Sequence, residues 1–167
     1  AENIFYDLRD LHNTKFIILR LSNVFGKPFS KNRNCWKLFI NNICQEAIIK
    51  QTITINSNPL IKRNFISIEF FLNKIKYIIN EKKDLNDYEI FNITSEKIYT
   101  LEEIANLVKK KIKNLLDFEI PIKYENKKSK IFSNSYSSKI NIDNRGDVFF
   151  ENEIEDLILY CKSEFGK

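Results

Sequence analysis

Glycine is the residue whose scarcity most limits what this chain can fold into. The 167 residues include only three glycines, Gly26, Gly146 and Gly166, whereas average usage would give roughly twelve. The phosphate-binding turn of a dinucleotide-binding fold needs three glycines within a few residues, so that the backbone can approach the pyrophosphate. The sequence therefore excludes such a turn from this chain.

In other respects the composition is that of one globular domain. Hydrophobic residues make up 43% of the chain and charged residues 29%, an ordinary balance for a chain that buries a core. No apolar run approaches the length of a transmembrane helix, and the polar start lacks the basic segment of a signal peptide. Met is absent even at position 1, so we expect a segment of a longer polypeptide or a trimmed product.

The cysteines and the net charge indicate the redox setting of the protein and limit the partners that we expect. An odd set of three cysteines without close spacing argues against a disulfide framework and favours a reducing, cytoplasmic setting. With His12 as the single histidine and no Cys-x-x-Cys, no structural zinc site is predicted and no metal ligand is assigned, although this argument leaves a carboxylate-bound Mg²⁺ site open. The net charge of +5 would suit nucleic acid, a membrane surface or an anionic metabolite. Because the lysines are spread over many segments, we predict neither a nucleic-acid nor a membrane partner.

A run of aliphatic and β-branched residues from Phe16 to Leu21 predicts a buried strand. Ser22 and Asn23 follow it, and Gly26 indicates a loop over residues 22–34. Ligands of open α/β sheets bind at the carboxyl ends of strands, and an Asn amide offers both a donor and an acceptor. Asn23 is therefore a candidate ligand-binding residue, although an Asn that only closes the turn is an equally good interpretation.

Helical and strand periodicities alternate along the rest of the chain. They predict helices over residues 1–13, 35–50, 69–80, 100–115 and 151–162, strands over 52–55, 65–68, 88–93 and 121–124, and a polar loop over 125–138. The clearest helix start is Thr100, because Thr100 and Glu103 match the T-x-x-E capping box. The lysines that follow position 108 are interpreted as a solvated helix face.

Arg63 is the second candidate, since it lies just ahead of a predicted strand. Its planar fork of donors suits bidentate phosphate binding; an exposed Arg at a strand edge is the alternative. No catalytic set of residues is visible. A nucleophilic triad needs a His near a nucleophile and a carboxylate, and the single histidine, His12, lies on a predicted helix with no such partners suggested. Tyr124 and Lys128 have a Tyr-x-x-x-Lys spacing, but they lie in a predicted loop and we regard the match as chance. No catalytic residue is assigned.

Several short motifs, taken in order, resemble the extended short-chain dehydrogenase/reductases, the NAD-dependent sugar-nucleotide epimerases and dehydratases. Ala1-Glu2 resembles the end of the family's YxxxKxxAE helix, and residues 19–26 resemble its LRxxNVYG stretch. Residues 62–66 resemble its RDFxxV motif, with Asn64 in place of Asp. Residues 88–93 resemble its yNig strand, and residues 100–104 resemble its tlxEla helix start. None of these motifs is specific alone, and their order and spacing carry the resemblance.

The resemblance implies an α/β fold. The chain would be the carboxyl-terminal part of a Rossmann-like extended short-chain dehydrogenase/reductase, with the small mixed substrate-binding subdomain and without the amino-terminal dinucleotide-binding part. Residues 1–33 would form the tail end of the dinucleotide-binding fold, and residues 34–167 mainly the substrate-binding subdomain. The catalytic Tyr and Lys would lie just before residue 1, so the chain alone is expected to be inactive.

The resemblance also assigns roles to the matching positions. Asn23 would hydrogen-bond the phosphate or sugar of the substrate, and Arg63 would clamp the nucleotide diphosphate. Asn34 and Leu38 would contact the nucleotide at the entry to the next helix, where the helix N-terminus also favours an anion. The remaining two positions, which would lie near the nicotinamide end of NAD, are Ser22 and Val24.

The expected function is the substrate-binding part of an epimerase or dehydratase that acts on a UDP- or dTDP-sugar in bacterial surface polysaccharide synthesis. The full-length protein would use NAD or NADP, and a homodimer is compatible with the resemblance. The family's second Arg, in an RPGD-like motif, has only Lys127 or Arg145 as candidate substitutes here. The alternatives are a non-catalytic nucleotide-sugar or anion-binding module and, less favoured, a basic nucleic-acid-binding domain.

Overall fold

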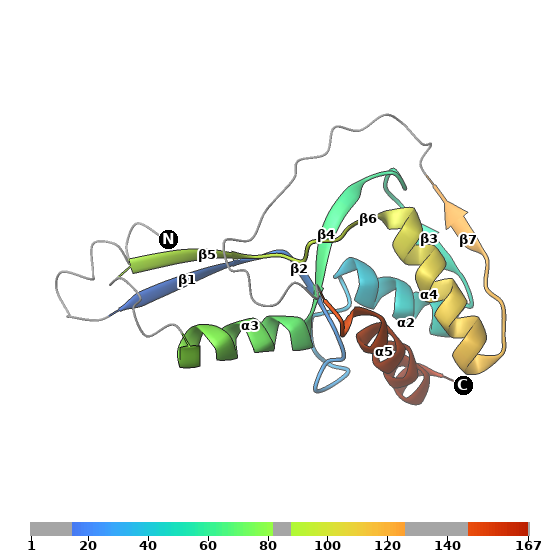
Figure 1. Ribbon diagram of the computed structural model, residues 1–167. Helices are drawn as coiled ribbons and strands as arrows, with labels where there is room; N and C mark the ends of the chain where they lie inside the picture. The colour runs from blue at the N-terminus through green and yellow to red at the C-terminus, as the bar shows by residue number, and fades with distance from the viewer. Residues whose placement is uncertain (1–14, 82–87, 126–146, 167) are drawn as a thin grey trace.

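The computed structural model describes residues 15–81, 88–125 and 147–166. The predicted helix over residues 1–13, with His12, lies outside these ranges, as do Lys127, Arg145 and nearly all of the predicted loop over 125–138. The described elements form two ends with a small sheet between them (Figure 1).

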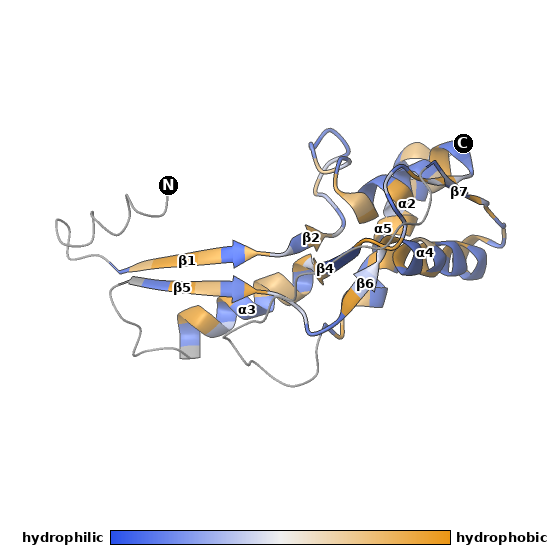
Figure 2. Ribbon diagram, turned by 90° about the horizontal axis from the view of Figure 1, so that it is seen from above, coloured by the Kyte–Doolittle hydropathy of each residue, from blue (hydrophilic) through white to orange (hydrophobic). Residues whose placement is uncertain are grey.

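One end of the molecule is a parallel pair of strands backed by a helix. Strand β1 (Phe16–Leu21) pairs with β5 (Tyr88–Ile93), so that Leu19 lies opposite Phe91. Helix α3 (Ile68–Glu81) covers this pair, and both strands are mainly hydrophobic (Figure 2). The predicted bounds of β1 and β5 are confirmed, since each strand is long enough to display its pattern in the sequence. The predicted burial of β1 was wrong, because all of its residues are half-buried or exposed.

A second sheet connects the two ends. Strand β2 (Asn23–Phe25) runs parallel to β4 (Lys62–Ser67), and β4 runs antiparallel to β6 (Ile98–Thr100). The predicted loop over residues 22–34 was therefore wrong at its start, and β6 was not predicted at all. Strands of three residues are too short to show a period, and their formation depends on pairing with β4.

The other end holds the main hydrophobic core. Helices α2 (Phe39–Lys50), α4 (Leu101–Leu116) and α5 (Phe150–Phe165) pack around it with the parallel strands β3 (Ile53–Ile55) and β7 (Ile122–Tyr124). The core is built almost wholly of aliphatic side chains and a few aromatic rings. Among the described residues, no helix combines the length and the apolarity that a bilayer-spanning helix needs.

Helix α2 starts later than predicted. The pattern placed its start at Cys35, but the segment before Phe39 is a turn in which the Leu38 amide donates to the Cys35 carbonyl at 3.0 Å. Trp36 is held outside the helix: its Nε1 donates to the Lys31 carbonyl at 2.8 Å and its ring stacks on Tyr160 with 6.3 Å between centroids. The affinity of this ring for α5 overrides the local helical pattern.

Helix α4 has the predicted capping box, and its removal should be measurable. The Glu103 amide donates to Thr100 Oγ1 at 3.1 Å, and the Thr100 amide donates to Glu103 Oε2 at 2.6 Å. Replacing Thr100 with Ala is expected to lower the free energy of unfolding by about 1 kcal/mol in urea titrations, because an orphan backbone donor loses its acceptor. Lys110→Ala on the exposed face of α4 is the control and should change stability little; equal effects of both variants would contradict the cap.

Candidate functional site

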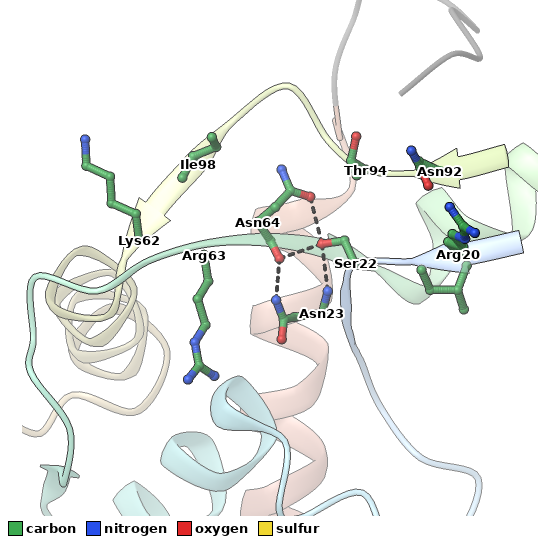
Figure 3. A pocket seen from close by; sticks show the side chains of 10 residues that line it. Arg20, Ser22, Asn23, Lys62, Arg63, Asn64, Asn92, Thr94 and Ile98 are labelled. Carbon is green, nitrogen blue, oxygen red and sulfur yellow. Dashed lines mark hydrogen bonds between the residues drawn. The ribbon is translucent and has the colours of Figure 1, made fainter. Parts of the chain in front are cut away.

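A cleft of about 630 Å³ opens where the polypeptide leaves β1 and β5. Polar residues follow both strands directly, Ser22 after β1 and Thr94 after β5, and β4 forms the opposite wall. This is the carboxyl edge of a parallel pair, which is where open α/β sheets bind ligands. The lining residues are Arg20, Leu21, Ser22, Asn23, Lys62, Arg63, Asn64, Asn92, Thr94 and Ile98 (Figure 3).

Asn23 and Arg63 both line this cleft. Their side chains extend on the same side of β4, whereas Lys62 and Asn64 point to the other side (Figure 3). The Asn23 amide is held in place, since its Nδ2 donates to the Asn64 carbonyl at 2.8 Å. The Arg63 guanidinium forms no ion pair with a described residue, so its donors are available to an anion. The structure thus brings the two principal sequence candidates to one cleft.

Ser22 also lies in the cleft, but its polar groups serve the fold. Its amide donates to the Ile93 carbonyl at 3.1 Å and so ties the end of β1 to the end of β5. Its hydroxyl lies 2.6 Å from the Asn64 carbonyl oxygen and 2.8 Å from Asn64 Oδ1, and it accepts the Asn23 amide at 2.7 Å. These bonds fix the turn on which Asn23 is presented.

The other three sequence candidates do not line this cleft. Val24 packs against the cluster between α3 and the β1–β5 pair. Asn34 is exposed in the turn before α2, and Leu38, 44% exposed, immediately precedes that helix without a side-chain cap. Their assignment to nucleotide or cofactor binding stays a prediction.

Seven of the ten lining residues were not among the sequence candidates: Arg20, Leu21, Lys62, Asn64, Asn92, Thr94 and Ile98. Arg20 lies opposite Asn92 in the register of β1 and β5, so only the pairing of distant segments reveals that they share a face. With Arg63, they give the cleft three basic side chains and no acidic one among its ten lining residues. Such a one-signed, concave surface attracts anions.

The described residues form no glycine-rich turn of the kind that holds the pyrophosphate of a dinucleotide. Gly26 is the one described glycine near the cleft strands, and a Cβ built there would lie 2.7 Å from both Glu153 Oε1 and Ile68 Cγ2. Its missing side chain therefore makes room for the protein's own α5 and α3 and cradles no ligand. Within the described ranges, no group of three or more His, Cys, Asp or Glu side chains could hold a metal ion.

Comparison with solved structures shows where this arrangement occurs. The chain matches UDP-glucose 4-epimerase with a TM-score of 0.74 at 15% identity, over 99% of this chain and 54% of that one. It matches UDP-N-acetylglucosamine 4-epimerase from Methanobrevibacter ruminantium M1, solved with UDP-N-acetylmuramic acid, with a TM-score of 0.65 at 18% identity, over 98% and 51% of the two chains. The chain has the fold of the carboxyl-terminal half of an extended short-chain dehydrogenase/reductase.

A third match is a dehydratase, so structures similar to this chain also occur in a second class of enzyme. dTDP-glucose 4,6-dehydratase from Bacillus anthracis str. Ames, solved with NAD, is 14% identical with a TM-score of 0.63, over 97% of this chain and 49% of that one. The chain thus spans about half the length of these extended short-chain dehydrogenase/reductases. No protein-family model and no curated protein matches the sequence. The fold class predicted from the sequence motifs is confirmed.

Proposed function

We propose that this chain is the substrate-binding portion of an NAD-dependent epimerase or dehydratase that acts on a UDP- or dTDP-sugar. The observation that carries this proposal is the basic cleft at the strand ends, in which Asn23 and Arg63 extend on the same side of β4. The extended short-chain dehydrogenase/reductase fold supports it, because nucleotide-sugar enzymes share that fold.

In this proposal the cleft binds and orients the nucleotide sugar. Arg63 supplies a planar pair of N–H donors for a diphosphate oxygen pair, and Asn23 offers its remaining N–H and its Oδ1 to phosphate or sugar. The described residues include no group that we assign to hydride or proton transfer. In this proposal another part of the full-length protein therefore carries out the redox step with NAD or NADP. The full-length protein would be a cytoplasmic homodimer that acts in bacterial surface polysaccharide synthesis.

Replacing Arg63 with Ala is expected to weaken UDP binding by about 10- to 100-fold, measured by calorimetry at fixed ionic strength. The reason is that hydrogen bonds to charged groups contribute about 1.5–3 kcal/mol each, and every 1.4 kcal/mol corresponds to a factor of ten. Arg33→Ala is the matched control, because Arg33 is exposed and does not line the cleft. UDP affinity that is equal in the Arg63 variant and the wild type would refute the proposal.

A non-catalytic nucleotide-sugar or anion-binding module is the second candidate, since the described residues form no dinucleotide-binding turn. Both candidates predict UDP-sugar binding, so the assay that separates them is complementation. A catalytic half should restore NAD-dependent turnover when combined with the missing half of the fold, whereas a module should not. Nucleic-acid binding would instead fall steeply with salt and would not respond to Asn23→Ala.

A further inference from the structure

Asn64 is a buried amide at the junction of the segments that line the cleft (Figure 3). We propose that Asn64 is the positioning residue of this cleft: its side chain locks the β1–β2 turn and the loop after β5 onto β4, and only an amide can do so. This inference rests on the proposed function of the cleft as a nucleotide-sugar site.

The contacts of the Asn64 side chain use both of its ends. Oδ1 accepts from the Ser95 amide at 3.1 Å and lies 2.8 Å from the Ser22 hydroxyl. Nδ2 donates to the Ser95 carbonyl at 2.7 Å and to the Lys97 carbonyl at 3.1 Å. A backbone donor on one side and two backbone acceptors on the other define which end of the amide is which, because the reverse orientation would place donors against a donor.

The backbone of Asn64 completes the connection to the ligand-binding side chains. Its carbonyl accepts Asn23 Nδ2 at 2.8 Å, and the Ser22 hydroxyl lies 2.6 Å away from the same oxygen. Arg63 is the preceding residue on β4. A shift of β4 at Asn64 would therefore move the guanidinium and release the carboxamide at the same time, although Asn64 itself points away from both (Figure 3).

Burial makes this network sensitive to the chemistry of one side chain. Asn64 is 8% exposed and Ser95 is 5% exposed, and in the described part of the chain every buried side-chain N or O atom has a hydrogen-bond partner. In such surroundings a polar group that loses its partner costs more free energy than it would in water. The Ser95 hydroxyl also donates to the Lys97 carbonyl at 3.0 Å, so the loss of Nδ2 would fall mainly on the Ser95 carbonyl.

A carboxylate cannot take the place of this amide. Asp has the shape of Asn but, when ionised, it only accepts hydrogen bonds, so one of its oxygens would face the Ser95 and Lys97 carbonyls. Burial and those carbonyls would raise the pKa of an introduced Asp. Once protonated, the carboxyl would regain one donor. The RDFxxV motif that this stretch resembles carries Asp here, so the dependence on an amide is a property of this chain.

The test is UDP binding by Asn64→Asp, measured by calorimetry from pH 7.5 to pH 5 and expressed relative to the wild type at each pH. We expect the variant to bind about tenfold more weakly or worse at pH 7.5, and the deficit to shrink as the pH falls through the pKa of the new carboxyl. Asn152→Asp, an exposed substitution on α5 with the same charge change, should bind as the wild type does. Equal affinity of Asn64→Asp and the wild type at pH 7.5, or a deficit that does not depend on pH, would overturn the inference.

Two further measurements keep the inference testable by itself. Ser95→Ala removes a hydroxyl that is outside the cleft lining but accepts a hydrogen bond from Asn64 Nδ2 at 3.2 Å. This variant should weaken UDP binding several-fold. If Asn64→Asp does not fold, an unchanged UDP affinity in Ser95→Ala overturns the inference. If the wild type binds no UDP, the proposed function fails. Amide exchange then decides the positioning role: faster exchange at Ser95 and Asn23 in Asn64→Asp supports it, and unchanged exchange overturns it.

Discussion

Replacing Phe150 with Ala is expected to lower the free energy of unfolding by about 3–5 kcal/mol. The Phe150 ring is 4% exposed at the start of α5. It meets the edge of Phe25 and stacks on Tyr99, with 4.9 Å between centroids in both pairs. The ring therefore joins α5 to β2 and β6, and its removal would leave a cavity between the main core and the sheet that carries the cleft.

Urea titration followed by far-UV circular dichroism measures this loss. Phe29→Ala is the matched control, because the Phe29 side chain is 95% exposed and its truncation should change stability by no more than about 0.5 kcal/mol. A loss below about 1 kcal/mol for Phe150→Ala would contradict the packing of α5 against β2 and β6.

The elements that the sequence predicted well are those whose signals are local. β1 and β5 have the predicted bounds, and α4 starts beside the predicted cap at Thr100. A six-residue, mainly hydrophobic run or a capping box lies within a few positions of the chain, so no tertiary information is needed to recognise either one.

The errors have a common physical cause, which is tertiary contact. β2 and β6 become strands because β4 offers them backbone partners, and Trp36 leaves the helical pattern to pack on α5. The lysines of α4 give an intermediate case. Lys111 was included in a solvated face, but its Nζ lies 2.7 Å from both Glu151 and Glu155 on α5, and these carboxylates raise the pKa of Lys111.

The residues of the cleft divide in the same way, into those with a local sequence signal and those without one. Asn23 and Arg63 could be proposed from a strand end and a short motif, because each signal lies in its own segment. Arg20 and Asn92 could not, since they meet only through the register of β1 and β5. Asn64 was visible in the sequence only as a departure from the motif, and its hydrogen bonds to Ser95 and Lys97 are what give that departure a meaning.

Replacing Asp147 with Ala is the second change with a large expected effect, a loss of about 2–4 kcal/mol in the free energy of unfolding. Asp147 Oδ2 accepts the Ser67 amide at 2.7 Å, and Oδ1 accepts the Ser67 hydroxyl at 2.8 Å and the Phe149 amide at 3.2 Å. Ser67 is fully buried at the end of β4, so the variant would leave its amide without a partner, away from water.

The same carboxylate connects the starts of two helices. The Ser67 hydroxyl, which Asp147 holds, also accepts the Phe70 amide in the first turn of α3 at 3.1 Å, and Asp147 Oδ1 itself accepts the amide of Phe149, the residue just before α5, at 3.2 Å. Asp156→Ala on the exposed side of α5 is the matched control and should change stability by at most about 0.5 kcal/mol. If both aspartates gave equal losses, the connection between the helices would be refuted.

The pH dependence gives this prediction a second, independent readout. Burial raises the pKa of Asp147, against the opposing effect of its hydrogen bonds to Ser67 and Phe149 and of Lys74. The folded chain therefore binds this proton more tightly than the unfolded chain, and the contribution of Asp147 to the free energy of unfolding rises as the pH falls through the folded pKa. Burial raises the pKa of Glu153, and the charge of Asp147 raises it further, so Glu153 changes the stability difference in the same direction. The stability difference between the wild type and Asp147→Ala should thus be smaller at pH 7 than at pH 4, and a difference that narrows on acidification would show that the carboxyl is not held in the desolvated site between α3 and α5.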